Sequence, residues 1–121
     1  MVRGLHAQSV AGFGGANGLR DEALLESAVA RPRTLHAYEN DSSLFDLAAA
    51  YCHGIIRNHP FVDGNKRAGL LAASVFLHIN GYEFRPDEGE TVNIIMAVAD
   101  GSADELLLSR WFADFSMPKN N

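Results

Sequence analysis

The sequence has little of what several protein classes require. It contains one cysteine, Cys52, which excludes an internal disulfide framework, and the helical apolar pattern around it predicts a buried thiol. The longest apolar run, from Ala68 to Leu77, is too short to span a lipid bilayer. The first residues lack the apolar core of a secretion signal. We therefore expect a cytoplasmic protein that has no membrane partner.

Basic residues are also scarce. Lys and Arg together number 10 against 15 Asp and Glu, and the net charge is -5. No basic stripe is present, so we expect no direct binding of nucleic acid. The hydrophobic share of 47% and the charged share of 21% are typical of ordinary globular proteins. The length of 121 residues predicts a single domain over 1–121.

Apolar residues recur at helical spacing along most of the chain, which predicts an all-α fold. The expected helices cover residues 21–31, 42–58, 65–79, 91–99 and 104–115. Pro32 is expected to end the first of them, and a surface loop should follow from Arg33 to Asp41. Residues 82–86 read as a connector that is briefly extended, and residues 116–121 as a loose terminus. The helix over 65–79 is apolar nearly all round, which predicts a central buried helix.

A polar stretch, NHPFVDGNKR, separates two of these apolar helices at residues 58–67. The proline at its third position keeps His59 out of helical geometry. The tripeptide Asp63–Asn65 has the composition of a turn, so a helix should begin within it. Lys66 and Arg67 then lie in the first helical turn, where cations oppose the helix dipole. This arrangement predicts that an anion binds nearby.

The same stretch has the composition of a phosphate cradle. Backbone N–H groups at a helix start, Gly64 and the flanking cations of Lys66 and Arg67 all favour phosphate, and Arg67 can hold it through two parallel hydrogen bonds. His59 can accept the proton of a hydroxyl group near neutral pH. Asp63 offers a hard oxygen ligand for the Mg²⁺ that accompanies nucleotide phosphates such as those of ATP. Read from its residues alone, this is a site for phosphoryl or nucleotidyl transfer.

Simpler interpretations of these residues also exist. Asp63–Asn65 by itself is compatible with a plain turn before a helix. His59 and Asp63 are compatible with metal binding, although no Cys or His cluster accompanies them. The spacing of acidic residues does not match a calcium-binding EF-hand loop. Only the full combination of residues favours catalysis.

The nine residues HPFVDGNKR, from His59 to Arg67, resemble the motif of the Fic/Doc family. The ending Asn65–Arg67 is similar to the Doc (death-on-curing) branch of that family. Further stretches resemble Doc-type chains, namely Gly18–Asp21, Leu24–Ala28, Ala30–Pro32, Phe76–Leu77 and Asn80–Tyr82. The resemblance implies a Fic fold, a compact helical bundle. It also suggests that the chain opens inside the first helix of that fold.

This resemblance implies a Doc-like toxin that transfers the γ-phosphate of ATP to a protein hydroxyl group, with elongation factor Tu as the target and arrest of translation as the result. His59 would be the general base. Asp63 would bind Mg²⁺ or orient the acceptor. Gly64, Asn65, Lys66 and Arg67 would hold the phosphates, with Arg67 counted among the catalytic residues. The segment from Arg33 to Asp41 would form a flap that docks the target.

Two alternatives remain open. The first alternative is transfer of AMP, which is the usual Fic reaction. Fic enzymes usually carry a glycine where this chain has Lys66, and the lysine favours phosphate transfer. Fic enzymes also carry a glycine at the position of Gly64, as this chain does, and this similarity keeps AMP transfer open. A non-catalytic module that senses a nucleotide is the other alternative. Self-inhibited Fic proteins carry a Ser/Thr-x-x-x-Glu-Gly/Asn pattern that this sequence lacks. We therefore expect inhibition in trans by an antitoxin protein.

Overall fold

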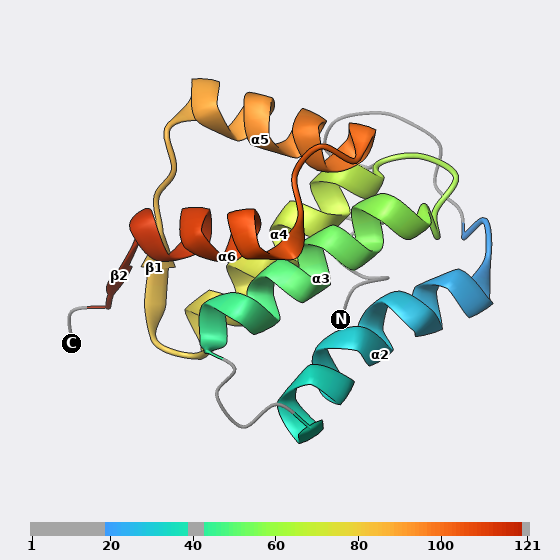
Figure 1. The fold of residues 1–121 in the computed structure, drawn as a ribbon, viewed down its shortest axis with the longest axis horizontal. Helices are drawn as coiled ribbons and strands as arrows, with labels where there is room; N and C mark the ends of the chain where they lie inside the picture. The colour runs from blue at the N-terminus through green and yellow to red at the C-terminus, as the bar shows by residue number, and fades with distance from the viewer. Residues whose placement is uncertain (1–18, 39–42, 120–121) are drawn as a thin grey trace.

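The computed structural model describes residues 19–38 and 43–119. Within this part five helices and two short strands follow one another (Figure 1). In chain order they are α2 (Glu22–Tyr38), α3 (Leu44–Asn58), α4 (Asn65–Ile79), β1 (Tyr82–Phe84), α5 (Glu88–Asp100), α6 (Glu105–Asp114) and β2 (Ser116–Pro118). The predicted all-α fold is confirmed. Our expectations for residues 1–18, 39–42 and 120–121 lie outside the described residues.

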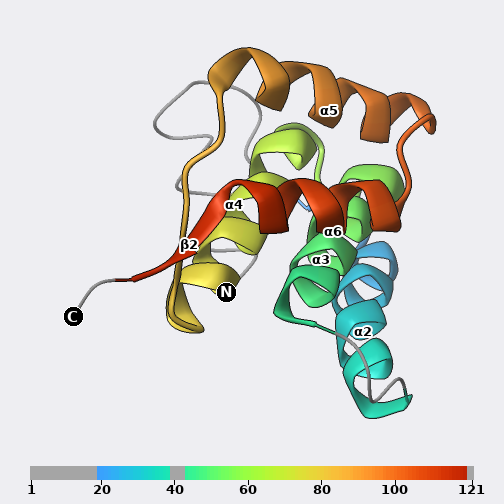
Figure 2. The same ribbon diagram turned by 60° about the vertical axis from the view of Figure 1, so that its left-hand side comes forward.

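Helix α3 makes contacts with most of the other helices. It packs against α2 on one side, against α6 on another and along α4, as the two ribbon views show (Figures 1 and 2). The helix was expected to begin at residue 42 or 43, and Ser43 caps it: the Ser43 hydroxyl accepts from the N–H of Asp46, and the Asp46 carboxylate accepts from the N–H of Ser43. Seven of its residues are buried, namely Leu47, Ala48, Ala49, Ala50, Cys52, Ile55 and Ile56.

Helix α4 begins where the sequence predicted, at Asn65, and much of it is buried. Ala68, Ala72, Ala73 and Leu77 have no exposed surface, which confirms a buried helix after the polar stretch. Its outer side is less covered than the sequence indicated, because Ile79 at its end is 70% exposed. The polar stretch thus joins the ends of two helices that pack against each other, and both ends of the loop are fixed.

Two glycines let neighbouring helices approach α3 closely. A Cβ atom on Gly69 of α4 would lie 3.0 Å from the carbonyl oxygen of Cys52 and 3.0 Å from Cγ1 of Ile56. A Cβ atom on Gly54 of α3 would lie 3.2 Å from the carbonyl oxygen of Ala28 in α2. Both contacts are tighter than ordinary packing, so the small residues set the spacing between these helices.

The prediction that Pro32 ends the first helix is wrong, because α2 continues through it to Tyr38. A proline inside a helix costs about 3 kcal/mol, partly because it cannot donate to the carbonyl four residues earlier. Here that carbonyl belongs to Ala28, which packs against Gly54 of α3, and Pro32 itself is buried. The packing of α2 on α3 stabilises a continuous helix where the local sequence favours a break. The loop expected over residues 33–41 is consequently helical up to residue 38.

The prediction of a loose terminus is also wrong for residues 116–118. They form β2, which pairs antiparallel with β1, and Glu83 lies opposite Met117. The pairing extends beyond the strands, since the N–H of Arg85 donates to the carbonyl of Phe115 at 2.8 Å. The extended connector over 82–86 was predicted. Its pairing with β2 was not, because β2 lies more than thirty residues further along the chain.

Helix α5 begins three residues earlier than expected, because the Asp87 carboxylate accepts from the N–H of Glu90 and caps it. Helix α6 begins at the predicted place, where Asp104 accepts from the N–H of Leu107. Trp111 and Phe112 of α6 are buried, as the sequence indicated. None of the helices over the described residues combines the length and the apolar character needed to cross a membrane.

Candidate functional site

His59 ends α3 in an unusual backbone conformation. Its φ of 49° and ψ of 54° are left-handed, and it is the one non-glycine residue with positive φ in the part of the chain that the structure describes. Such a conformation costs of order 1–3 kcal/mol and persists where surrounding contacts fix it. The N–H of His59 donates to the carbonyl of Ile55 at 3.2 Å. The side chain is exposed, so a ligand can reach the imidazole ring.

Residues just before α2 hold the loop from one side. The Arg20 guanidinium donates to the His59 carbonyl through Nε at 2.7 Å and to the Asn58 carbonyl through a terminal nitrogen at 3.1 Å. The backbone N–H groups of Arg20 and Asp21 both donate to the Pro60 carbonyl, at 2.7 and 3.0 Å. Our sequence analysis assigned no role to Arg20. The one indication in the sequence that involved Arg20 was the resemblance of Gly18–Asp21 to Doc-type chains.

Asn65 holds the loop from the other side, at the start of α4. The N–H of Phe61 donates to Asn65 Oδ1 at 3.0 Å, and Asn65 Nδ2 donates to the Phe61 carbonyl at 3.0 Å. The Asn65 side chain is buried, with a residue exposure of 5%. The Asn65 amide thus shapes the loop, and the predicted binding of phosphate by Asn65 stays a prediction.

The same amide faces the imidazole ring of His59, because Asn65 Nδ2 lies 3.3 Å from Nδ1 of His59. The two bonds to the backbone of Phe61 fix which end of the amide is the NH₂ group. Nδ1 therefore accepts in this contact, and a neutral His59 carries its proton on Nε2. The amide thus orients the ring, and in this tautomer the proton on Nε2 must leave before Nε2 can act as a base.

The first turn of α4 fits an anion. Gly64 is its N-cap with φ 78° and ψ 20°, and no side chain caps the helix. Helix geometry leaves the first N–H groups without intrahelical partners. The Asp63 carboxylate accepts from the N–H of Gly64 at 2.8 Å and so stays outside the helix. The turn contains no acidic residue, and its two cations, Lys66 and Arg67, are exposed.

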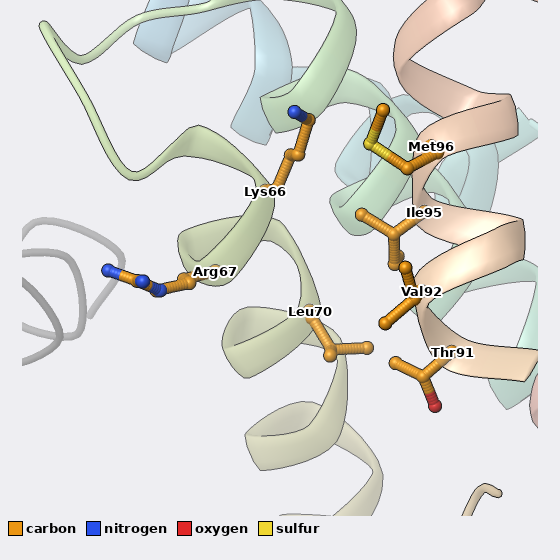
Figure 3. A pocket seen from close by; sticks show the side chains of 7 residues that line it. All are labelled: Lys66, Arg67, Leu70, Thr91, Val92, Ile95 and Met96. Carbon is orange, nitrogen blue, oxygen red and sulfur yellow. The ribbon is translucent and has the colours of Figure 1, made fainter. Parts of the chain in front are cut away.

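A groove of about 230 Å³ lies between α4 and α5 next to this turn. Lys66 and Arg67 stand at one end, and Leu70, Thr91, Val92, Ile95 and Met96 line the remainder. Figure 3 shows Leu70 of α4 facing the apolar side chains of α5 across the groove, while the side chains of Lys66 and Arg67 leave α4 in different directions. The sequence predicted a helix over 91–99 but no role for it in a site, because no local pattern indicates that α5 lies beside the start of α4.

Asp63 is the one predicted metal ligand. Its carboxylate is at the exposed surface of the loop beside the α4 start. Over residues 19–38 and 43–119, no group of three or more His, Cys, Asp or Glu residues is placed to hold a metal ion. Mg²⁺ commonly binds through one or two carboxylates together with substrate phosphates, so a single carboxylate beside a phosphate cradle fits that ion but not zinc.

Other titratable groups lie outside this site. Complete burial raises the pKa of Cys52 to about 12, so this thiol is not a nucleophile near neutral pH. Burial also lowers the pKa of His53, while the nearby Glu105 opposes that shift. Arg31 pairs with the same Glu105 at 3.2 Å, so these residues link α2, α3 and α6. His78 is exposed near the far end of α4, about 18 Å along the helix axis from Lys66 at 1.5 Å per residue.

Comparison with known proteins gives one matching family and two relatives. A family model described as the Fic/DOC family matches residues 1–77 of this chain. Toxin Doc of Mycolicibacterium smegmatis is 48% identical over 84 residues, which cover 69% of this chain and 64% of that protein. The chain thus spans slightly less than two thirds of the length of this relative. Protein kinase doc of Escherichia phage P1 is 33% identical over 97 residues, which cover 80% of this chain and 76% of that protein.

Proposed function

This chain belongs to the Fic/DOC family, and from that premise we propose that it is a Doc-like toxin that transfers the γ-phosphate of ATP to a protein hydroxyl group. One observation carries the proposal: an oriented histidine, His59, stands beside an uncapped helix start that bears two cations, Lys66 and Arg67. The relative named Protein kinase doc supports phosphate transfer, and the relative named Toxin Doc supports a role as a toxin.

The proposed chemistry needs one proton acceptor. The oxygen of the target hydroxyl attacks the γ-phosphorus, the bond from that phosphorus to the β,γ-bridging oxygen breaks, and ADP leaves. His59 takes the hydroxyl proton. For Nε2 of His59 to accept this proton, the proton of the neutral ring must first move from Nε2 to Nδ1. The 3.3 Å contact with Asn65 then becomes unfavourable, because an N–H of His59 faces the NH₂ group of Asn65. The exposed ring can exchange this proton with water, so the neutral imidazole can reach the accepting form.

ATP in this proposal binds along α4. Its phosphates accept hydrogen bonds from the backbone N–H groups after Gly64, and the positive charges of Lys66 and Arg67 attract them. The groove between α4 and α5 is smaller than the 300–1,000 Å³ typical of pockets for whole ligands, so it suits part of the nucleotide. Its apolar lining beyond Lys66 fits the flat face of the base, with Val92 and Met96 on the α5 side.

Asp63 would hold Mg²⁺ in this site, together with phosphate oxygens of the bound nucleotide. The ion would neutralise charge that develops on the phosphates as the bond breaks. The bond that Asp63 accepts from the N–H of Gly64 keeps its carboxylate beside the cradle.

We further propose that the target is a translation factor such as elongation factor Tu and that an antitoxin protein inhibits the enzyme in trans. The sequence supports inhibition in trans because it lacks the inhibitory Ser/Thr-x-x-x-Glu-Gly/Asn pattern. The docking role proposed for the segment 33–41 now concerns the end of α2, because residues up to 38 are helical.

Transfer of AMP is the second candidate, and one observation favours it. Gly64 has φ 78°, a conformation that leaves the main chain open to close approach by a diphosphate. Lys66 opposes this candidate because its side chain stands beside the same turn, where it offers charge to a terminal phosphate.

Expression in bacteria tests the toxin proposal. Expression of the unchanged chain should arrest growth, and His59→Ala should abolish the arrest. His78→Ala is the matched control, because His78 is also an exposed histidine and lies at the other end of α4. Arrest that persists in His59→Ala would contradict the role of His59 as base.

A further inference from the structure

We propose that Arg20 is a positioning residue for His59, an inference that rests on the proposed function of His59 as base. Arg20 lies 39 residues before His59 in the chain and precedes α2. Arg20 is not among the residues that line the groove, and all of its hydrogen bonds described above go to the loop that carries His59.

Arg20 binds three consecutive carbonyl groups. Its side chain donates to Asn58 and His59, and its backbone N–H donates to Pro60. These carbonyls end α3, where the last C=O groups of a helix have no intrahelical partner. A cation at a helix C-terminus is also favoured by the helix dipole. Arg20 therefore caps the C-terminus of α3, the helix whose C-cap residue is His59.

The cap matters because His59 is left-handed. Its φ of 49° is unfavourable for a residue with a side chain, and a relaxed backbone would move the imidazole away from the start of α4. The 2.7 Å bond from Arg20 Nε restrains the direction of the His59 carbonyl and thereby the ψ angle of His59. The hydrogen bond between Asn65 and His59 goes to the ring, so it does not restrain the His59 carbonyl.

Arg20 contributes little to the core. It is exposed, whereas the core on this side of the molecule consists of Leu25, Ala28, Ile55, Phe61, Ala68 and Ala72. Loss of the guanidinium should therefore misplace His59 more than it destabilises the fold. Misplacement of a catalytic group by about 1 Å can cost about 100-fold in rate. The phosphate cradle stays intact, so the KM for ATP should not change.

The test compares Arg20→Ala and Arg20→Lys with Arg31→Ala in the full chain. Arg31 is a matched control because it is an exposed arginine of α2 whose guanidinium pairs with Glu105 of α6. We expect a fall of kcat of about 10- to 100-fold in Arg20→Ala at unchanged KM for ATP. Arg20→Lys should lie between Arg20→Ala and the unchanged chain, because an ammonium group keeps the charge but not the two-carbonyl geometry. Arg31→Ala should keep its kcat.

A second measurement separates this inference from the proposed function. The Cε1–H signal of His59 in an NMR spectrum, assigned by its loss in His59→Ala, should shift in Arg20→Ala and stay in place in Arg31→Ala. A chain without transfer activity would contradict the proposed function, yet this signal would still decide the role of Arg20. An unshifted signal, or an unchanged kcat in an active enzyme, would overturn the inference. If Arg20→Ala does not fold, the same two readouts in Arg20→Lys decide it.

Discussion

Asn65 and His59 are linked by a contact that sets the chemistry of the loop. Nδ2 of Asn65 lies 3.3 Å from Nδ1 of His59, while the same amide exchanges two 3.0 Å hydrogen bonds with the backbone of Phe61. One buried side chain therefore shapes the loop and orients the proposed base. Residues of α2, α3 and α4 meet at this loop, so its geometry depends on the packing of all three helices.

This contact predicts the tautomer of His59 in the free protein. Because Nδ1 accepts from Asn65, a neutral His59 should carry its proton on Nε2. Asn65→Ala removes the donor, and the two tautomers should then approach the mixture of an exposed histidine. Long-range ¹H–¹⁵N NMR correlations of the imidazole nitrogens distinguish the two forms. A proton on Nδ1 in the unchanged protein would show that the amide does not orient the ring as described.

If the base of ATP binds in the apolar groove, a charged substitution on the groove wall should lower the affinity for ATP. Val92→Glu places a carboxylate on the groove wall, so ATP should bind about 10-fold more weakly, which corresponds to about 1.4 kcal/mol. Ile79→Glu is the control: Ile79 is equally apolar and exposed, and lies about 20 Å along α4 from Lys66 at 1.5 Å per residue. Calorimetric titration with a non-hydrolysable ATP analogue measures both. Equal weakening by the two variants would argue against nucleotide in the groove.

Gly69→Ala tests the close packing of α3 on α4. The added Cβ would lie 3.0 Å from the Cys52 carbonyl oxygen and from Cγ1 of Ile56, so the helices must move apart. We expect the free energy of unfolding to fall by about 1–3 kcal/mol. Gly89→Ala in the first turn of α5 should instead leave it unchanged or raise it by up to about 1 kcal/mol, because the nearest atom to that Cβ is a side-chain oxygen at 3.4 Å. Urea denaturation followed by circular dichroism reports both values.

Ser109→Ala should reduce stability in a way that depends on pH. The Ser109 hydroxyl donates to Asp46 at 2.6 Å and is the main cause that holds the pKa of Asp46 below its usual 3.8; burial acts in the opposite direction. A lowered pKa in the folded state stabilises the fold above the unfolded pKa of about 3.9, and this contribution is lost as the pH falls through the folded pKa. Because the Asp46 carboxylate is partly open to solvent, which screens the interaction, we expect a loss of about 0.5–1 kcal/mol at pH 7 that shrinks below about pH 4.

The control for this change is Ser27→Ala, which removes an exposed hydroxyl from α2. Its effect should stay within about 0.5 kcal/mol at either pH. Thermal denaturation at pH 7 and at pH 3 measures the difference. A loss for Ser109→Ala that is the same at both pH values would mean that the charge of Asp46 does not contribute.

Features encoded by neighbouring residues were predictable from the sequence. Asp63–Asn65 is a turn before a helix, and α4 begins there; Ser43 is a helix cap, and α3 begins after it. Burial of Cys52 followed from the apolar period of its helix. The exposed Lys66 and Arg67 in the first turn of α4 also belong to this group, because they directly follow the turn; that they bind phosphate stays a prediction.

Features that depend on packing between distant residues were not predictable. The contact of Ala28 with Gly54 stabilises α2 beyond Pro32, where the local sequence favours an end. Arg20 reaches His59 across 39 residues of chain. The groove exists because α5 lies beside the start of α4. In each case the partners are set by the tertiary fold, and no periodicity within either segment indicates them.

The most direct test of the proposed function uses ATP labelled at the γ- or at the α-phosphate. The purified protein is incubated with Mg²⁺, a bacterial lysate and either label, and His59→Ala is the control. We predict that a protein in the lysate acquires label from the γ-phosphate only, and that His59→Ala transfers none. Label from the α-phosphate would mean AMP transfer and would contradict the role that we propose for Lys66.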